Sequence, residues 1–176
     1  MTFYSGFSLS SDKQLFEAYL KDSDYTIAGF SYGAIKAFEE AKSTKTRVDT
    51  LQLFSPAFFQ DKSEKFKRMQ NMYFAKDKNG YLQNFLSSCF LPAQVDTDVQ
   101  IEEGSAEDLQ RLLSYVWKPD ELKAIHDRGI AIEVYLGSED KIIDPQAAKA
   151  FFLPYATTYM INHAGHTLQT KSEEGK

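Results

Sequence analysis

The sequence has little cysteine and no long apolar run. Its 176 residues include a single cysteine, Cys89, which excludes an internal disulfide framework and a zinc site built on paired cysteines. No stretch reaches the roughly 18 apolar residues that a membrane-spanning helix needs. The opening residues, MTFYSGFSLSSDK, lack the basic and apolar regions of a signal peptide. We therefore expect a cytoplasmic protein, with Cys89 as a buried small apolar residue.

Acidic residues outnumber basic residues in this sequence. The chain has 20 lysines and arginines against 25 aspartates and glutamates, a net charge of -5. This balance argues against a protein whose main surface binds nucleic acid, because such a surface neutralises phosphates with basic residues. In contrast, 43% of the residues are hydrophobic and 14% are aromatic, which is enough to build one sizeable core. The sequence predicts a single domain.

Strand-like and helix-like segments alternate along most of the chain. Expected strands are 2–6, 25–30, 48–56, 130–138 and 157–162, and expected helices are 8–22, 33–42, 118–129 and 145–154. The helix over 8–22 would be amphipathic, with Ser10 or Ser11 as its cap. Strands that alternate with helices imply a mostly parallel sheet in a three-layer α/β domain.

Residues 57–118 interrupt this alternation. They carry aromatic and aliphatic residues at helical spacing and no convincing strand, so we expect a helical insertion. The α/β core is then 1–56 with 119–170, and 171–176 (KSEEGK) forms a flexible tail. Within the insertion, 62–78 is mainly basic and 96–108 is purely acidic.

The stretch GFSYG places Ser31 between Gly29 and Gly33, after an apolar strand and before a helix. One interpretation is an ordinary turn with a solvated hydroxyl group. The other is a nucleophile elbow, in which a sharp strand-to-helix turn exposes the serine and small residues relieve the crowding of the two backbones. The flanking strand and helix favour the elbow.

A serine nucleophile needs a histidine base that lies later in the chain than its acid partner. His126 precedes the candidate acid loop and is better explained as a surface histidine. His163 and His166 both follow the last expected strand. We favour His166, because Gly165 gives the loop freedom to turn and His163 falls at the strand end. His163 remains an alternative.

The acid is expected in the loop after the strand 130–138, where YLGSEDKIID offers Glu139, Asp140 and Asp144. Asp144 precedes Pro145 and is better explained as a helix cap, although it remains an alternative. Glu139 is better explained as solvated. Asp140 is therefore the predicted acid, which completes a Ser31, Asp140 and His166 triad.

The oxyanion that forms during acyl transfer needs backbone N–H donors. The elbow architecture takes one donor from the residue after the nucleophile, here Tyr32, and one from a loop after an earlier strand. Phe7, in the turn SGFS at 5–8, fits the second role because Gly6 lets the main chain come close. Its ring could also wall the acyl pocket. A tight turn with a core phenylalanine would explain the same residues.

These motifs resemble the α/β-hydrolase family. SGF stands where that family has its His-Gly oxyanion turn, GFSYG matches the elbow, and GSEDKIIDP and HAGHTL resemble the acid and histidine loops. The resemblance implies a minimal α/β-hydrolase fold, with residues 57–118 as a helical lid. Ser5 replaces the usual histidine. Only about 24 residues separate the turn from the elbow, so we expect about five parallel strands rather than eight.

Among compact members of that family, the chain resembles the short esterases that act on pimeloyl-acyl carrier protein methyl ester in biotin precursor synthesis. The segments FYSGFS, GFSYGA and LFSPAFF carry this likeness. It implies a serine carboxylesterase that needs no metal or organic cofactor and has an acyl carrier protein as partner. Docking would use the basic residues Lys62, Lys65, Lys67 and Arg68, although a solvated helix face explains these charges equally well.

Two other functions remain open. A thioesterase or a broad-specificity carboxylesterase would use the same triad, so only a substrate profile separates these enzymes from the methyl ester esterase. A noncatalytic binding protein with a hydrolase fold is the alternative of another class. Its signature would be a broken triad, whereas all three residue types are present here.

Overall fold

A computed structural model describes residues 1–171, so most of the expected tail, residues 172–176, lies outside the described part. The strands are β1 (Thr2–Tyr4), β2 (Leu9–Ser10), β3 (Thr26–Phe30), β4 (Thr50–Phe54), β5 (Gln100–Ile101), β6 (Ala131–Gly137) and β7 (Thr157–Ile161). The helices are the 3₁₀ helix η1 (Asp12–Phe16), α1 (Tyr32–Ser43), α2 (Glu64–Lys76), α3 (Lys78–Phe90), α4 (Ala106–Ser114), α5 (Pro119–Asp127) and α6 (Pro145–Phe152).

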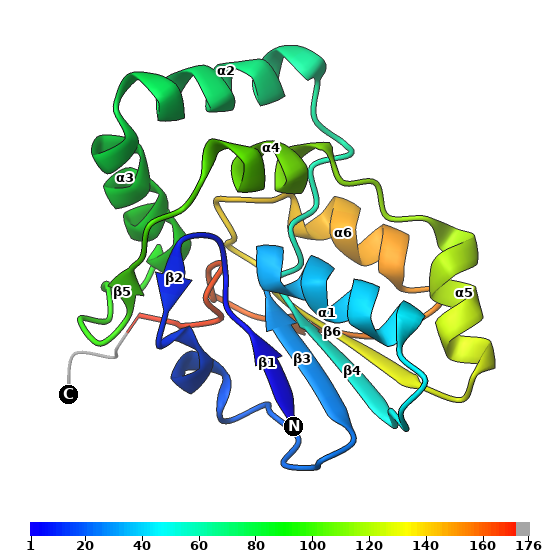
Figure 1. The fold of residues 1–176 in the computed structure, drawn as a ribbon. Coiled ribbons are helices and arrows are strands. Elements are labelled where there is room, and N and C mark those ends of the chain that lie inside the picture. Colours follow the sequence, from blue (N-terminus) through cyan, green and yellow to red (C-terminus); the bar gives the residue numbers. More distant parts are fainter. Residues whose placement is uncertain (172–176) are drawn as a thin grey trace, which may run out of the picture.

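Five strands form one parallel sheet in the order β1-β3-β4-β6-β7. The expected fold class and strand number are therefore confirmed. The carboxyl ends of these strands point toward α4 (Figure 1). In a parallel sheet the loops that leave these ends share one edge, so the segments after β1, β3, β6 and β7 can meet there. None of the helices within residues 1–171 is both long and apolar enough to cross a membrane.

One face of the sheet is covered by α1, α5 and α6. Leucine, isoleucine and valine side chains of β3, β4 and β6 join helix residues in a single buried cluster. Trp117 lies at its centre, with its ring 5.0 Å from the Phe38 ring of α1 and 5.1 Å from the Phe152 ring of α6. Large aromatic contacts of this kind account for much of the burial that stabilises a small domain.

Over residues 1–171, the other face of the sheet lacks the long helix that was expected from the sequence. The predicted amphipathic helix over 8–22 is wrong, because this segment forms only β2, the short η1 and a loop. Ser11 has a left-handed backbone, with φ of 60°, and its side chain makes no capping hydrogen bond. Phe16 nevertheless covers the sheet, with its ring stacked 4.7 Å from that of Phe54. The Phe16 ring and its buried neighbours thus cover this face of the sheet in place of a long helix.

A polar network fastens the loop after η1 to the same face. Gln52 of β4 donates to the Tyr19 carbonyl (2.9 Å) and to Glu133 (3.0 Å), and accepts from the Lys21 backbone N–H (3.0 Å). Lys21 also pairs with Glu133 through its ammonium group. Because buried polar groups are costly without partners, these bonds fix the loop in one position.

The segment between β4 and α5 is mainly helical. Helices α2, α3 and α4 lie beyond the carboxyl ends of the strands (Figure 1). Ser63, Asp77 and Ser105 cap these helices by accepting a backbone N–H in the first turn. The expectation of no strand here was wrong in one detail, because β5 pairs antiparallel with β2. That pairing ties the helical segment to the turn after β1.

The turn around Ser31 depends on close backbone approaches. A Cβ on Gly29 would lie 2.2 Å from the Gly33 carbonyl oxygen, and a Cβ on Gly33 would lie 2.0 Å from the Tyr4 carbonyl oxygen. Both obstructing atoms belong to the main chain rather than to the flexible end of a side chain. Only glycine therefore lets α1 start directly beside β1 and β3.

We predict that Gly29→Ala and Gly33→Ala each lower the free energy of unfolding by about 3 kcal/mol or more, because the added methyl group forces a backbone shift. Gly129→Ala is the matched control. Gly129 has φ of +81°, but a Cβ added there would meet nothing within 4 Å, so we expect a change of about 1 kcal/mol. Urea denaturation followed by circular dichroism measures all three. Equal effects at Gly129 and Gly33 would contradict the crowding argument.

Candidate active site

Ser31 joins β3 to α1 in a strained backbone conformation, with φ of 53° and ψ of -114°. Its N–H donates to the Phe54 carbonyl (2.9 Å), and its carbonyl accepts from Ala34 and Ala57 (3.1 Å each). A non-glycine residue at positive φ is uncommon and persists where surrounding contacts fix it. The side chain is therefore held at the carboxyl edge of the sheet and at the N-terminus of α1. This is the geometry expected of a nucleophile elbow.

His166 contacts Ser31 and Asp140 through its two ring nitrogens. Its Nε2 lies 3.0 Å from Ser31 Oγ, and its Nδ1 lies 2.6 Å from Asp140 Oδ2. The side chains of His166 and Asp140 are both fully buried. Because a carboxylate only accepts hydrogen bonds, Nδ1 carries the proton and Nε2 is left to accept the proton of Ser31. This arrangement can activate a serine hydroxyl group.

Asp140 is oriented by its own loop. Its Oδ1 accepts the backbone N–H groups of Ile142 (2.7 Å) and Ile143 (3.0 Å), which leaves Oδ2 directed to His166. Asp144 instead accepts the N–H groups of Gln146 and Ala147 as the cap of α6. Glu139 lies near His163, outside the buried contact. Of the three acids in this loop, only Asp140 meets the Ser31 and His166 pair.

The other two histidines lie apart from Ser31. His163 has a side chain that is 84% exposed and contacts Glu139, and His126 lies exposed at the end of α5. The expected reason for Gly165 needs correction. The positive φ values in this loop belong to His163 and Leu168, whereas Gly165 is needed because a Cβ would lie 1.9 Å from the Leu91 carbonyl oxygen. Glycine is therefore required at position 165 because there is no room for a side chain, and not because the backbone needs a positive φ.

Phe7 and Tyr32 are the predicted oxyanion donors. Tyr32 is the first residue of α1, so its N–H has no helical carbonyl one turn earlier. Phe7 lies in the turn after β1, lines the same pocket as Ser31, and its N–H bonds to none of the described residues. Its ring is fixed between those of Phe74 (6.1 Å) and Phe85 (5.9 Å). Neither N–H group has a hydrogen-bond partner among the described residues, so both remain available as donors.

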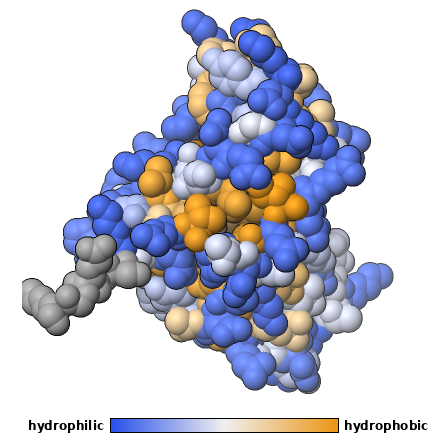
Figure 2. Space-filling view, turned by 90° about the vertical axis from the view of Figure 1, so that its left-hand side faces the viewer, coloured by the Kyte–Doolittle hydropathy of each residue, from blue (hydrophilic) through white to orange (hydrophobic). Residues whose placement is uncertain are grey.

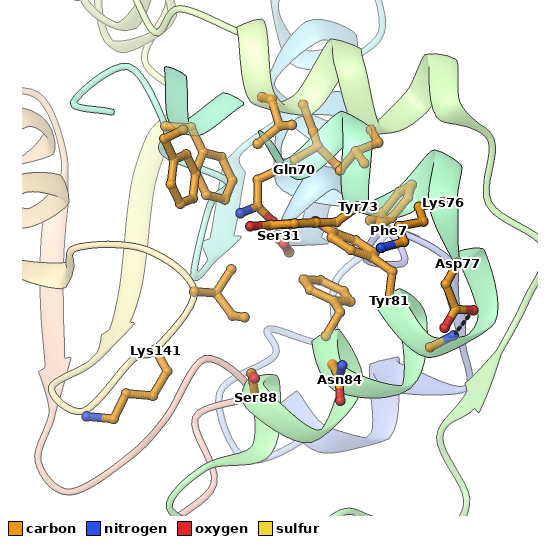
Figure 3. A pocket seen from close by; sticks show the side chains of 18 residues that line it. Phe7, Ser31, Gln70, Tyr73, Lys76, Asp77, Tyr81, Asn84, Ser88 and Lys141 are labelled. Carbon is orange, nitrogen blue, oxygen red and sulfur yellow. Dashed lines mark hydrogen bonds between the residues drawn. The ribbon is translucent and has the colours of Figure 1, made fainter. Parts of the chain in front are cut away.

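Ser31 opens into a pocket of about 650 Å³ under α2, α3 and α4 (Figure 3). The walls are largely aromatic and aliphatic, and the lining includes Phe7, Phe59, Phe66, Tyr73, Tyr81, Phe85, Leu109, Leu112, Leu113 and Ile142. Most of these residues had helical spacing that was visible in the sequence. Met69, Leu86 and Val116 have the same helical spacing in the sequence but do not line the pocket: Leu86 is buried in the other core cluster, and Val116 is 52% exposed. The pocket suits an apolar chain with a reactive group at Ser31.

Several polar pocket residues had no sequence signal of their own. Gln70 reaches from α2 into the pocket (Figure 3) and accepts a hydrogen bond from Tyr81 at 2.9 Å. Burial raises the pKa of Tyr81 to about 12, so its hydroxyl group is protonated at neutral pH and serves as the donor. Phe66, Gln70 and Tyr73 follow one helical face, and this spacing was the only available clue.

Cys89 lies near this site but is a poor candidate nucleophile. It is fully buried, and burial together with the charge of Asp140 raises the pKa of its thiol well above the ordinary value. The reactive thiolate is therefore strongly disfavoured at neutral pH. The buried, apolar character expected from the sequence is confirmed.

The four predicted docking residues differ in their surroundings. Lys62 pairs with Asp61, and Lys67 pairs with Glu64. Lys65 and Arg68 are exposed and form no ion pair with the described residues. Local carboxylates thus offset two of the four charges, while two face solvent on the outside of α2.

Apolar residues are also visible on the side of the molecule that carries α3 and β5 (Figure 2). Figure 2 shows apolar residues gathered near the middle of this face, with hydrophilic residues around them. Leu91 and Val95, in the segment after α3, are 48% and 40% exposed. Through the contact of Gly165 with the Leu91 carbonyl, this segment lies directly against the histidine loop.

Solved structures match this overall fold. Naproxen esterase from Bacillus subtilis has a TM-score of 0.54 and 17% identity over 81% of this chain and 53% of its own. Carboxylesterase CesB from the same organism has a TM-score of 0.55 and 16% identity, over 89% of this chain and 57% of its own. E-2-(Acetamidomethylene)succinate hydrolase has a TM-score of 0.57 and 13% identity, over 94% of this chain and 84% of its own. The chain has the α/β-hydrolase fold.

The hydrolase fold is present here in a reduced form. The chain spans little more than half the length of the two Bacillus esterases. No protein-family model and no curated protein sequence matches it. At these low identities the likeness concerns the fold, and the chemistry must be argued from the site itself.

Proposed function

We propose that this chain is a serine carboxylesterase that removes the methyl group from pimeloyl-acyl carrier protein methyl ester, the activity called BioV in biotin precursor synthesis. The observation that carries the esterase part is His166, which bridges Ser31 and Asp140 in a buried site. Esterases and hydrolases among the solved structures with this fold support the same chemistry. The substrate rests on the sequence resemblance together with the pocket and the charges of α2.

In the first half of the reaction, His166 Nε2 takes the proton of Ser31 as Oγ attacks the ester carbonyl carbon. Asp140 holds the imidazolium that forms. The negative charge on the carbonyl oxygen is received by the N–H groups of Phe7 and Tyr32 and by the positive end of the α1 dipole. His166 then gives its proton to the methoxy oxygen, methanol leaves, and an acyl group remains on Ser31.

In the second half, His166 takes a proton from water as the water oxygen attacks the acyl carbon. Collapse of the second tetrahedral intermediate returns the proton to Ser31 Oγ and releases the free carboxylate. Every proton transfer uses His166, so these steps call on no cofactor. The same sequence of steps would hydrolyse a thioester, and the choice between the two depends on which bond the pocket presents to Ser31.

The pocket supports a linear acyl chain. Its apolar walls extend from Ser31 along α2 and α3, so methylene groups would be removed from water along their length. The far end of the chain would carry the carrier protein outside the pocket. A methyl ester at Ser31 then places the thioester at a distance from the nucleophile, which favours ester over thioester cleavage.

The outer face of α2 supports an acidic partner. Lys65, Arg68 and Met72 follow one another at spacings of three and four residues and are all exposed, so they share a face. This face combines positive charge with an apolar side chain that is 57% exposed. Acidic carrier proteins would be attracted to it electrostatically, although the chain as a whole carries a net charge of -5.

We predict that the wild type removes methyl groups from carrier-protein-bound pimeloyl methyl ester and that Ser31→Ala loses at least about 10³-fold in kcat/KM, because the nucleophile is gone. Mass spectrometry of the intact acyl carrier protein measures the conversion. Ser43→Ala, which changes an exposed serine at the other end of α1, is the matched control and should retain full activity.

Other outcomes of that experiment separate the alternatives. Loss of the whole acyl group from the carrier protein would indicate a thioesterase. An untouched carrier-protein substrate, with short soluble esters cleaved, would contradict the biotin-pathway substrate and leave a broad carboxylesterase. Equal turnover by wild type and Ser31→Ala would contradict the assignment of the nucleophile.

We also predict that the double reversal Lys65→Glu with Arg68→Glu raises KM for the carrier-protein substrate about five- to tenfold. Its kcat/KM for a small soluble ester should stay within about twofold, because both side chains lie outside the pocket lining. The control reverses two exposed lysines away from α2, Lys13 and Lys45. A similar KM increase in the control, or none in the α2 variant, would overturn the docking face.

A further inference from the structure

Asp12 is a buried carboxyl group that the proposed mechanism does not use. It is the first residue of η1 and is 0% exposed. Its Oδ1 has no hydrogen-bond partner among the described residues. Removing such a group from water costs free energy that a single hydrogen bond does not fully offset. A buried polar atom of this kind calls for a specific explanation.

The one bond that Asp12 makes reaches back across the turn after β1. Oδ2 accepts the backbone N–H of Gly6 at 2.8 Å, and this bond is fully buried. The turn itself is closed by the Leu9 N–H, which donates to the Gly6 carbonyl at 3.2 Å. Gly6 is thus held on both sides, through its N–H by Asp12 and through its carbonyl by Leu9.

The Gly6 carbonyl and the Phe7 N–H belong to one peptide unit, and the Gly6 N–H that Asp12 binds belongs to the unit before it, so the Gly6 backbone angles relate the two units. The space around Gly6 is tight, because a Cβ there would lie 2.8 Å from a ring carbon of Phe30. Rotation of the Gly6 backbone would change the direction of the Phe7 N–H, and Phe7 lines the same pocket as Ser31. Small changes in the direction of an oxyanion donor have large effects on rate, since such donors act over hydrogen-bond distances.

We propose that Asp12 is a positioning residue that fixes the direction of the Phe7 N–H by accepting the Gly6 N–H. It does not touch substrate. The proposal rests on the proposed function, because it assigns Asp12 a part in stabilising the oxyanion that acyl transfer forms.

The test compares Asp12→Ala and Asp12→Asn with the wild type, using a soluble p-nitrophenyl ester as substrate and an aryl trifluoromethyl ketone as inhibitor. The ketone forms a tetrahedral adduct with an active serine, so its affinity reports the oxyanion donors. We expect Asp12→Ala to lower kcat roughly 10- to 100-fold with little change in KM, and to weaken the ketone by a similar factor. Asp12→Asn keeps an acceptor oxygen and should recover most of both losses. Asp22→Ala, at an exposed aspartate on the same segment, is the control.

A purely structural role gives different results. If Asp12→Ala lowers the melting temperature but leaves kcat and the ketone affinity unchanged in the folded protein, the proposal is wrong. Loss of kcat in Asp12→Asn equal to that in Asp12→Ala would also overturn it, because the acceptor oxygen would then be irrelevant. If the wild type hydrolyses no ester and binds no ketone, the proposed function fails and this inference fails with it.

Discussion

The contact of His166 with both Ser31 and Asp140 is the interaction on which the rest of the structure depends. It joins three loops that are far apart in the sequence, after β3, β6 and β7, at one edge of the sheet. The side chains of His166 and Asp140 are fully buried, so the position of each loop must be closely fixed for the contact to form. Close approaches that only glycine permits supply this constraint, at Gly29, Gly33 and Gly165. Gly29 and Gly33 fix the elbow against β1, and Gly165 packs the histidine loop against Leu91, in both cases through main-chain atoms rather than flexible side chains.

The reduced hydrolase fold shows how few elements this geometry needs. Five parallel strands and three helices on one face form the main core. On the other face, Phe16 and the network around Gln52 and Glu133 cover the strands without a long helix. Stacked aromatic rings bury a large apolar area for each residue ordered, which makes them an effective substitute in a short chain. Helices α2 to α4 then supply the pocket walls, and the pairing of β2 with β5 ties them to the turn that carries Phe7.

The sequence predicted the parts of the structure that follow local rules. Alternating strands and helices indicated the parallel sheet, and GFSYG between a strand and a helix identified Ser31. Chain order and loop position selected Asp140 and His166, and Pro145 explained Asp144 as a cap. The prediction for segment 8–22 was wrong because its helical spacing was outweighed by packing: Phe16 stacks on the sheet and Ser11 turns the chain with a left-handed backbone. The role of Asp12 and the reason for Gly165 depend on contacts that no local pattern reveals, and the helical spacing of Gln70 with Phe66 and Tyr73 was the only sign of its place in the pocket.

The most direct test of the central claim is covalent labelling of the native protein with a fluorophosphonate, followed by peptide mass spectrometry. Activation of Ser31 by His166 predicts one adduct, on the peptide that contains Ser31, and strongly reduced labelling in His166→Ala. The account would be contradicted by an unlabelled wild type, by an adduct on another residue, or by equal labelling in the two proteins.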